Sequence, residues 1–213
     1  MSNGIDEIRG QKVLLRFEGK RCIHSRNCVL ERPDVFVPNA PGEWIHPDAA
    51  SPEAVAALAR NCPSGAITYE RLDGGESESA PKVNVCRVRE NGPLALSADL
   101  NVGGAKMLRA TLCRCGASAN KPYCDGSHTA AGFAATGEIA TQESTPLAKR
   151  DGELQVTPLP NGPLKVEGNL EVVTGTGRTV TRLEKCFLCR CGASSKKPFC
   201  DGTHNKIGFK TDA

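Results

Sequence analysis

Aromatic residues are scarce in this sequence, and long apolar runs are missing. Only 4% of the 213 residues are Phe, Trp or Tyr, whereas glycine and proline contribute 22 and 14 residues. This balance excludes a large aromatic core and favours short strands joined by many turns. Domains of this kind often need a metal or crosslinks for stability. No apolar run reaches the roughly 18 residues of a membrane-spanning helix, so we expect no membrane association.

The sequence also lacks a concentration of charge of one sign. The net charge is +3, and no five like charges are adjacent. So slight an excess does not indicate a nucleic-acid partner. The polar N-terminus includes Asp6 and Glu7 and resembles neither a signal peptide nor a transit peptide, which predicts a cytoplasmic protein.

Cysteine, by contrast, is abundant, with eleven residues in the chain. In a reducing compartment, clustered cysteines indicate metal binding rather than disulfide bonds, and the odd count agrees with this. Cys86 and Cys186 lie outside the motifs described below, and we expect each to be a small buried apolar side chain.

A polar segment over residues 71–81, rich in glycine and serine, predicts a linker between two domains. In residues 1–70 the pattern predicts three elements, namely a strand over 12–17, a helix from the N-cap Ser51 to Cys62, and a strand over 67–69. This order fits a small ferredoxin-like unit. In residues 82–213, alternating apolar residues predict a mainly β region, so the predicted fold class is α+β.

The β region contains an internal duplication. Cys113–His128 aligns with Cys189–His204 without a gap, 76 positions apart, and 12 of the 16 aligned residues are identical. We therefore expect two repeats, over about residues 82–145 and 146–213.

The spacing within each repeat groups four soft ligands. In an extended segment, Cys113 and Cys115 point to the same side and can bind one metal ion together, which leaves Arg114 to face solvent or a carboxylate. Cys124 and His128 are four residues apart, so one helical turn would place them on a common face. Three thiolates and an imidazole suit either zinc or an iron–sulfur cluster. Structural zinc sites normally have about two to four residues between cysteines, and the single residue here favours the cluster.

Both segments resemble the CDGSH iron–sulfur motif, including its internal serine and proline, which are Ser118 and Pro122 in the first repeat. The resemblance covers roughly residues 82–213 and implies a redox-active [2Fe–2S] cluster in each repeat. The implied ligands are Cys113, Cys115, Cys124 and His128 in the first repeat, and Cys189, Cys191, Cys200 and His204 in the second. Tandem members of this family fold as a pseudo-twofold equivalent of the homodimer that single-motif members form, so the resemblance implies a monomer.

A single histidine ligand in each cluster predicts a reduction potential between those of plant-type ferredoxins and Rieske centres. The unperturbed pKa of imidazole is about 6.5, which predicts pH-dependent redox behaviour and clusters that acid releases. Replacing either histidine by cysteine should lower the potential and slow the loss of the cluster in acid.

The N-terminal region carries a third candidate site. Cys22, Cys28 and the distant Cys62, which precedes a proline, match the ferredoxin arrangement for a cubane cluster, except that Ser25 replaces the middle cysteine. Three cysteines favour a [3Fe–4S] cluster, or a [4Fe–4S] cluster with another fourth ligand, for which His24 is the first candidate and Ser25 the weaker one. The segment resembles the divergent mono-cluster ferredoxins over about residues 10–70. The alternatives are a surface role for His24 and a ferredoxin fold that has lost its metal.

These sites predict an iron–sulfur protein that exchanges single electrons with a redox protein. Delivery of clusters to an apo iron–sulfur acceptor protein is the alternative, and a zinc-stabilised interaction module is a third hypothesis. The sequence shows no Ser–His–Asp set and no paired carboxylates, so we expect no enzymatic activity.

Overall fold

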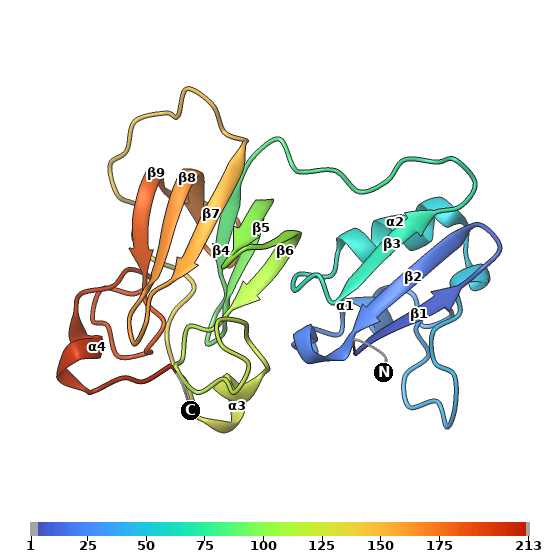
Figure 1. Ribbon diagram of the computed structural model, residues 1–213, viewed down its shortest axis with the longest axis horizontal. Helices are drawn as coiled ribbons and strands as arrows, with labels where there is room; N and C mark the ends of the chain where they lie inside the picture. Colours follow the sequence, from blue (N-terminus) through green and yellow to red (C-terminus); the bar gives the residue numbers. More distant parts are fainter. Residues whose placement is uncertain (1–3, 212–213) are drawn as a thin grey trace. The chain divides into compact units, whose positions relative to one another are not determined.

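The computed structural model describes residues 4–211, in which short strands outnumber helices (Figure 1). The chain divides between Ser79 and Ala80 into two compact units, called here the N-terminal unit and the C-terminal unit. The predicted mixture of helices and strands, with a majority of strands, is confirmed. No helix within the described range is long and apolar enough to span a bilayer. All eleven cysteines lie in this range, and none of them forms a disulfide.

The N-terminal unit contains a three-stranded antiparallel sheet. The strands, in the spatial order β1-β2-β3, are β1 (Ile5–Arg9), β2 (Val13–Glu18) and β3 (Ile67–Arg71). Between β2 and β3 the chain forms the 3-10 turn η1 (Gly19–Arg21), helix α1 (Asn27–Glu31), the 3-10 turn η2 (Pro47–Ala49) and helix α2 (Pro52–Arg60). The predicted strand, helix and strand are confirmed as β2, α2 and β3.

Helix α2 forms where the sequence predicts it. The Ser51 hydroxyl accepts a hydrogen bond from the Ala54 amide at 3.3 Å, and Pro52 occupies the first turn. Val55 and Leu58 are buried in one core with the apolar side chains of β2 and β3. Strand β1 is not among the predicted elements, because its side chains are mostly exposed and give no apolar alternation.

The C-terminal unit is a barrel-like sheet of six strands with two short helices. Its strands are β4 (Val85–Val88), β5 (Leu94–Val102), β6 (Ala105–Leu112), β7 (Glu153–Pro158), β8 (Leu164–Val173) and β9 (Thr179–Leu188). The helices are α3 (Ser127–Ala130) and α4 (Thr203–Lys206). Aliphatic side chains from all six strands form one core, which also contains Cys86 and Cys186, as expected for small buried side chains.

The two repeats exchange strands within this sheet. β4 of the first repeat pairs in parallel with β8 of the second, and β7 of the second pairs in parallel with β5 of the first. The registers are equivalent, because Val85 lies opposite Glu171 while Gln155 lies opposite Asn101. β5 and β8 each contain a bulge at the point where their neighbour on one edge changes. The first strand of each repeat therefore completes the sheet of the other repeat.

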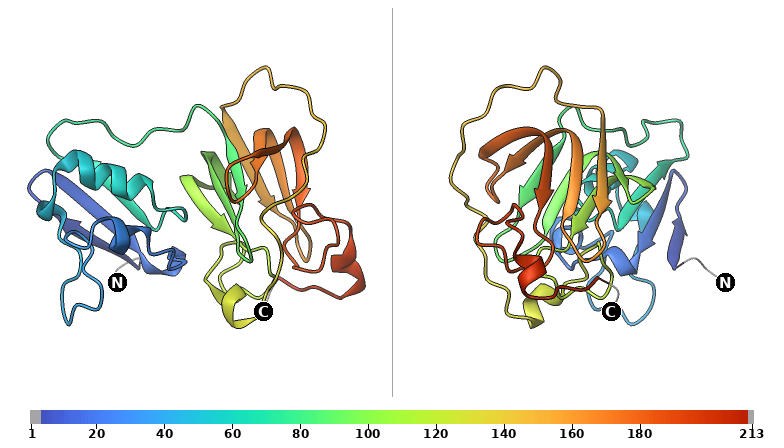
Figure 2. Two further views of the ribbon diagram at one scale, coloured as in Figure 1. Left: turned by 180° about the vertical axis from the view of Figure 1, so that it is seen from behind. Right: turned by 60° about the vertical axis from the view of Figure 1, so that its left-hand side comes forward.

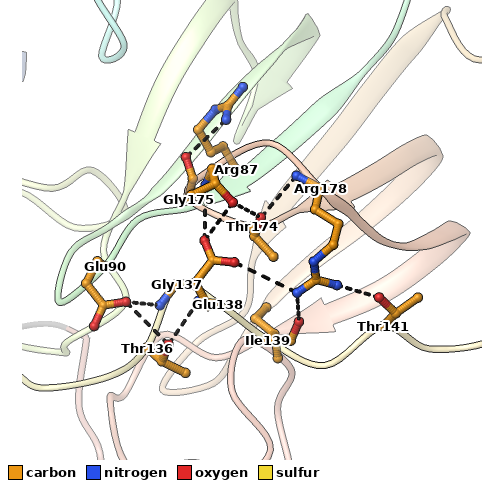
Figure 3. Close-up of polar contacts among 11 residues, drawn as sticks. Arg87, Glu90, Thr136, Gly137, Glu138, Ile139, Thr141, Thr174, Gly175 and Arg178 are labelled. Carbon is orange, nitrogen blue, oxygen red and sulfur yellow. Dashed lines mark hydrogen bonds and ion pairs between the residues drawn. The ribbon is translucent and has the colours of Figure 1, made fainter.

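Polar contacts tie the segment that follows α3 to both repeats (Figure 3). The Gly137 amide donates to Glu90, in the turn after β4, at 2.5 Å. Arg178, just before β9, donates to the Ile139 carbonyl at 2.7 Å and lies 3.8 Å from the Glu138 carboxylate. The connection out of the first motif is therefore held against the second repeat.

Helices α3 and α4 lie at the same end of the C-terminal sheet, beside the loops that follow β6 and β9 (Figures 1 and 2). Those loops carry the two cysteine- and histidine-containing motifs. The strand exchange therefore brings both motifs to one end of the C-terminal unit.

Candidate metal centres

Each motif begins where a long strand ends. Cys113 follows β6, and its amide donates to the Pro122 carbonyl at 2.8 Å. The Cys124 amide donates to the carbonyl of Thr111, in β6, at 2.9 Å. The corresponding residues of the second motif form the same two bonds, at 2.7 and 2.8 Å. The end of the strand therefore positions two of the three cysteines of each motif, and these hydrogen bonds hold the returning loop against the strand.

The donors of each motif are arranged in two pairs. The sulfurs of Cys113 and Cys115 are 3.8 Å apart, and the Cys124 sulfur lies 3.4 Å from Nδ1 of His128. In the second motif the corresponding separations are 3.8 and 3.3 Å. Two sulfurs bound at about 2.3 Å to one tetrahedral metal are roughly 3.8 Å apart, and a sulfur and a nitrogen are roughly 3.6 Å apart. Each pair therefore fits one tetrahedral metal, and each motif fits two.

The grouping in twos matches a two-iron cluster, in which each iron takes two protein ligands. Three thiolates and one imidazole are also suitable ligands for an iron–sulfur cluster. Across residues 4–211, no three His, Cys, Asp or Glu side chains converge as they do around a single metal ion.

The turn between Cys124 and His128 differs from the expected helical turn, and that prediction is wrong. Helix α3 begins only at Ser127, because Gly126 adopts a left-handed conformation with a φ of +88°. The Gly126 amide donates to the Cys124 sulfur at 3.4 Å. The thiol and the imidazole therefore approach each other across a tight glycine turn.

A serine and an aspartate shape the loop of each motif. The Ser118 hydroxyl donates to the Tyr123 carbonyl at 2.7 Å. The Asp125 carboxylate accepts from the amides of Ala119 and Ser127 at 2.9 and 3.0 Å. The second motif has the same three bonds, at 2.6, 2.8 and 3.0 Å. These contacts are made within the loop itself, and they orient the ligands on either side of it.

Hydrogen bonding and burial set the pKa values of the donors. The Cys115 thiol, together with neighbouring amides, lowers the pKa of Cys113 to about 6, and the same contact raises the pKa of Cys115. Burial raises the pKa of Cys124 to about 11 and lowers the pKa of His128, which favours the neutral imidazole that a metal requires.

The prediction that Arg114 faces solvent or a carboxylate is wrong. Arg114 is 1% exposed and donates to the carbonyls of Arg89 and Thr136 at 3.0 and 2.8 Å. Its guanidinium lies 5.7 Å from the centre of the Phe133 ring. Arg190 is also buried and lies over an aromatic ring in the same way. Each motif therefore encloses a buried cation between two of its cysteines.

The two motifs contact each other through their glycines. A Cβ atom on Gly116 would lie 2.6 Å from the carbonyl oxygen of Cys191, and one on Gly192 would meet the carbonyl oxygen of Cys115 at least as closely. Both glycines are left-handed, with φ values of +83° and +81°. A cysteine backbone of each motif therefore packs directly on the other motif, and the two donor sets are neighbours.

In the N-terminal unit, Cys22, Cys28 and Cys62 line one cavity of about 520 Å³, together with His24 and Ser25. If each of the eight atoms of a cubane cluster takes about the volume of a water molecule, roughly 30 Å³, the cavity has room for all of them. The structure therefore brings the three predicted cysteines together, from the loop after η1, from α1 and from the residue after the end cap of α2.

The three thiols of this cavity interact electrostatically. Burial raises the pKa of Cys22 and of Cys28, and the negative charge of Cys62 raises both further. Deprotonation of these thiols would bring like charges together, and a bound cationic iron would relieve that repulsion. The residues present therefore fit an iron–sulfur cluster.

His24 lies in the wall of the same cavity, and its side chain is exposed. Its backbone is left-handed, with a φ of 51°, which is uncommon outside glycine. Coordination of a cluster by His24 stays a prediction, as does coordination by Ser25.

Sequence reasoning missed the buried arginines and the contacts between the motifs. The available signal was repetition, because an arginine and a glycine recur at matching positions of both motifs. Repetition marks a residue as shared, but only the structure shows that Gly116 packs on the opposite repeat.

Comparison with protein-family models gives two matches. The family described as "Iron-binding zinc finger CDGSH type" matches residues 64–129 and 161–205, which are more than half of the chain. The family described as "Divergent 4Fe-4S mono-cluster" matches residues 8–72. A search of curated proteins found no match. Both resemblances predicted from the sequence are confirmed, and the chain belongs to the CDGSH family, with an N-terminal divergent 4Fe-4S mono-cluster domain, as a protein that binds iron–sulfur clusters.

Proposed function

We propose that this protein is a one-electron carrier whose two CDGSH motifs hold neighbouring [2Fe–2S] clusters that exchange electrons. The observation that supports this most directly is the reciprocal packing of Gly116 on Cys191 and of Gly192 on Cys115. In the proposal these two cysteines are ligands of different clusters. The backbone of each motif would then pack directly on a ligand residue of the other cluster, which supports electron exchange between the two clusters.

The paired donor distances support one cluster in each motif. The proposed ligands are Cys113, Cys115, Cys124 and His128 for the first cluster, and Cys189, Cys191, Cys200 and His204 for the second. A [2Fe–2S] cluster supplies a site that takes up and releases one electron. The amides of Ala117, Gly126 and Gly202, which donate to sulfurs at 3.4 Å, would stabilise the extra negative charge of the reduced state.

The exchanged strands support a pseudo-twofold arrangement of the repeats and a monomeric protein. The registers of β4 on β8 and of β7 on β5 are equivalent, as a twofold axis requires. Because each repeat completes the sheet of the other, both halves of such an interface are supplied by one chain.

In the N-terminal unit we propose a [3Fe–4S] or [4Fe–4S] cluster bound by Cys22, Cys28 and Cys62, with His24 as the candidate fourth ligand. The shared cavity and the electrostatic coupling of the three thiols support this assignment. This unit would be a third redox centre, built on a ferredoxin-like fold.

Cluster delivery is the second candidate function, and the partial exposure of His128 and His204 favours it. Water can reach an imidazole in such a position and compete for the iron. The partner would be a redox protein for electron transfer or an apo iron–sulfur protein for delivery. Neither role requires an enzymatic site, and both suit a reducing compartment such as the cytoplasm.

The test begins with iron, zinc and acid-labile sulfide on anaerobically purified protein, followed by a redox titration monitored by electron paramagnetic resonance. Two [2Fe–2S] clusters predict about 4 irons and 4 sulfides, and an N-terminal cluster raises the iron to roughly 7 or 8. We expect reversible one-electron reduction of the clusters. Zinc without sulfide would exclude the proposal.

Mixing the protein with apo-ferredoxin separates the two candidate functions. Under electron transfer the protein keeps its iron while it reduces an acceptor. Under cluster delivery the visible absorption of the protein decreases as that of the ferredoxin appears. The variant Cys115→Ser should lose one cluster, whereas the matched control Cys186→Ala, at a cysteine outside the donor sets, should keep both.

A further inference from the structure

We infer that the surface around the second CDGSH motif is the docking surface for an acidic protein that exchanges electrons with the neighbouring cluster. This inference rests on the proposed function and adds the chemistry of the partner. It comes from comparing the two motifs, whose donor sets match while their surfaces differ.

The segment that ends the second motif carries positive charge that the aligned segment of the first lacks. Residues 119–134 contain one lysine and one aspartate, whereas the aligned residues 195–210 contain four lysines and one aspartate. The formal charge is therefore 0 on the first segment and +3 on the second. One lysine of the second segment donates to a carbonyl of its own loop. The other three are exposed, and they are Lys196, Lys206 and Lys210.

Two exposed apolar side chains accompany these lysines. Ile207, which follows α4, is 52% exposed, and Phe187, near the end of β9, is 42% exposed. The Phe187 carbonyl accepts a hydrogen bond from the amide of the proposed ligand Cys200 at 2.8 Å, so Phe187 adjoins the cluster site. The aligned positions of the first motif hold a buried Thr111 and the small Ala131.

Apolar side chains with a charged rim are typical of a protein–protein interface. A basic rim attracts an acidic partner, speeds its encounter and orients it. Recognition of anionic lipid usually involves about four to eight cationic residues beside a membrane-spanning helix or on an amphipathic helix. The described residues contain no helix that could span a membrane, and α4 is only four residues long. The observations therefore favour an acidic protein over a membrane surface or a nucleic acid.

The two motifs also supply a conservative way to remove the charge. The Lys196 amide donates to the Ser194 hydroxyl at 3.0 Å, and the aligned Asn120 amide donates to Ser118 at the same distance. The helices α3 and α4 are equal in length, with alanine in α3 at the position of Lys206. The triple variant Lys196→Asn, Lys206→Ala, Lys210→Ala therefore gives the second motif the residues that the first already accommodates.

The experiment measures electron transfer from the dithionite-reduced, full-length protein to two carriers of opposite charge. Plastocyanin is the acidic probe and cytochrome c the basic one. In either reaction one electron leaves a reduced cluster, and one copper(II) or iron(III) centre gains it. The control variant Lys12→Asn, Lys82→Ala, Lys149→Ala removes the same charge from exposed lysines outside the motifs. Iron content and visible spectrum verify that both variants keep their clusters.

We expect the patch variant to reduce plastocyanin about ten-fold more slowly than the control variant at low ionic strength, and the difference to shrink as salt is added. Reduction of cytochrome c should not slow. Ile207→Ala should slow the reaction with plastocyanin at high salt as well, because it removes apolar contact rather than charge.

Equal rates for the patch and control variants would overturn the docking surface and leave electron transfer intact. Failure of the wild-type protein to reduce either carrier would instead overturn the proposed function. Binding to phosphatidylserine vesicles or to duplex DNA that the patch variant loses, without an effect on plastocyanin, would assign the surface to a different class of partner and overturn the inference.

Discussion

From the contact between the two motifs we predict that the energetic cost of backbone strain can be measured separately from the cost of overpacking. Gly116 and Gly126 lie in the same motif and have nearly the same left-handed conformation, with φ values of +83° and +88°. A Cβ atom at Gly126 would have no atom within 4 Å, whereas one at Gly116 would lie 2.6 Å from the carbonyl oxygen of Cys191. Gly126→Ala is therefore a matched control for Gly116→Ala.

Both substitutions should incur the cost of a left-handed alanine, which is about 1–2 kcal/mol. Gly116→Ala must in addition push the Cys191 backbone away by at least 0.4 Å to restore a contact of 3.0 Å. Overpacking of this kind costs about 1–3 kcal/mol. Gly116→Ala should therefore lower the free energy of unfolding by about 1–3 kcal/mol more than Gly126→Ala does.

Guanidinium unfolding of the iron-loaded protein, followed by far-ultraviolet circular dichroism and by visible absorption, measures this difference. The mirror pair Gly192→Ala and Gly202→Ala should behave in the same way, because Gly192 packs on Cys115 and Gly202 has open space. Equal destabilisation within each pair would mean that the motifs are not in contact, and the argument for neighbouring clusters would be lost.

Three further predictions concern single side chains. His204→Cys should lower the reduction potential of one cluster and slow the decay of its visible absorption at pH 5. Unchanged decay would mean that the histidine is not the ligand that acid releases. Cys62→Ala should remove about three or four irons per chain without altering the [2Fe–2S] spectrum, and an unchanged iron analysis would make the N-terminal unit metal-free. The side chain of Glu171 is 4% exposed, and the Arg150 guanidinium that bonds to it at 2.7 Å lowers its pKa. A carboxyl whose pKa falls on folding stabilises the folded state above its unfolded pKa, and this effect is lost as the pH falls. Glu171→Gln should therefore lower the free energy of unfolding by about 1–3 kcal/mol at pH 7 and by progressively less below about pH 4. Urea unfolding at a series of pH values measures this dependence.

The pair of Cys113 and Cys115 could be predicted from the sequence because it depends on local geometry. Cys113 and Cys115 are separated by one residue in an extended segment, and alternation alone brings their sulfurs to the same side. Helix α2 was predictable for a similar reason, since Ser51 and Pro52 mark its start. Such features need no knowledge of which segments meet in the folded chain.

The strand exchange could not be predicted, because pairing between repeats is not local. β4 alternates partly buried and buried residues and would suit a place beside either repeat. Side-chain alternation along the motif, from Cys113 to Cys115, predicted that Arg114 points outward, and that prediction also depended on local geometry alone. The chain leaves the sheet at Cys113, however, and the arginine donates to carbonyls from two other places, namely Arg89 and residues 135–136.

The burial of Arg114 links cluster binding to the stability of the C-terminal unit. Arg114 is 1% exposed, and within residues 4–211 no carboxylate lies at ion-pair distance from it. Burial lowers the pKa of Arg114, and the acidic groups near enough to oppose that effect include the proposed ligand Cys189 and Glu90. A buried charge is costly without an opposite charge nearby, and an iron–sulfur cluster with thiolate ligands supplies negative charge next to this arginine.

Removal of the metal should therefore destabilise the wild-type protein more than the variant Arg114→Met, in which no buried cation needs compensation. Arg114→Met itself should cost about 3–5 kcal/mol, since it leaves buried carbonyls without a donor. The informative quantity is the double-mutant comparison, namely the fall in melting temperature on chelation in wild type against that in the variant. Arg87→Met, at a guanidinium that donates to the Gly175 carbonyl, is the control and should respond to chelation as wild type does. Equal falls in wild type and Arg114→Met would show that the arginine is held by its carbonyl bonds alone, and that the clusters do not compensate its charge.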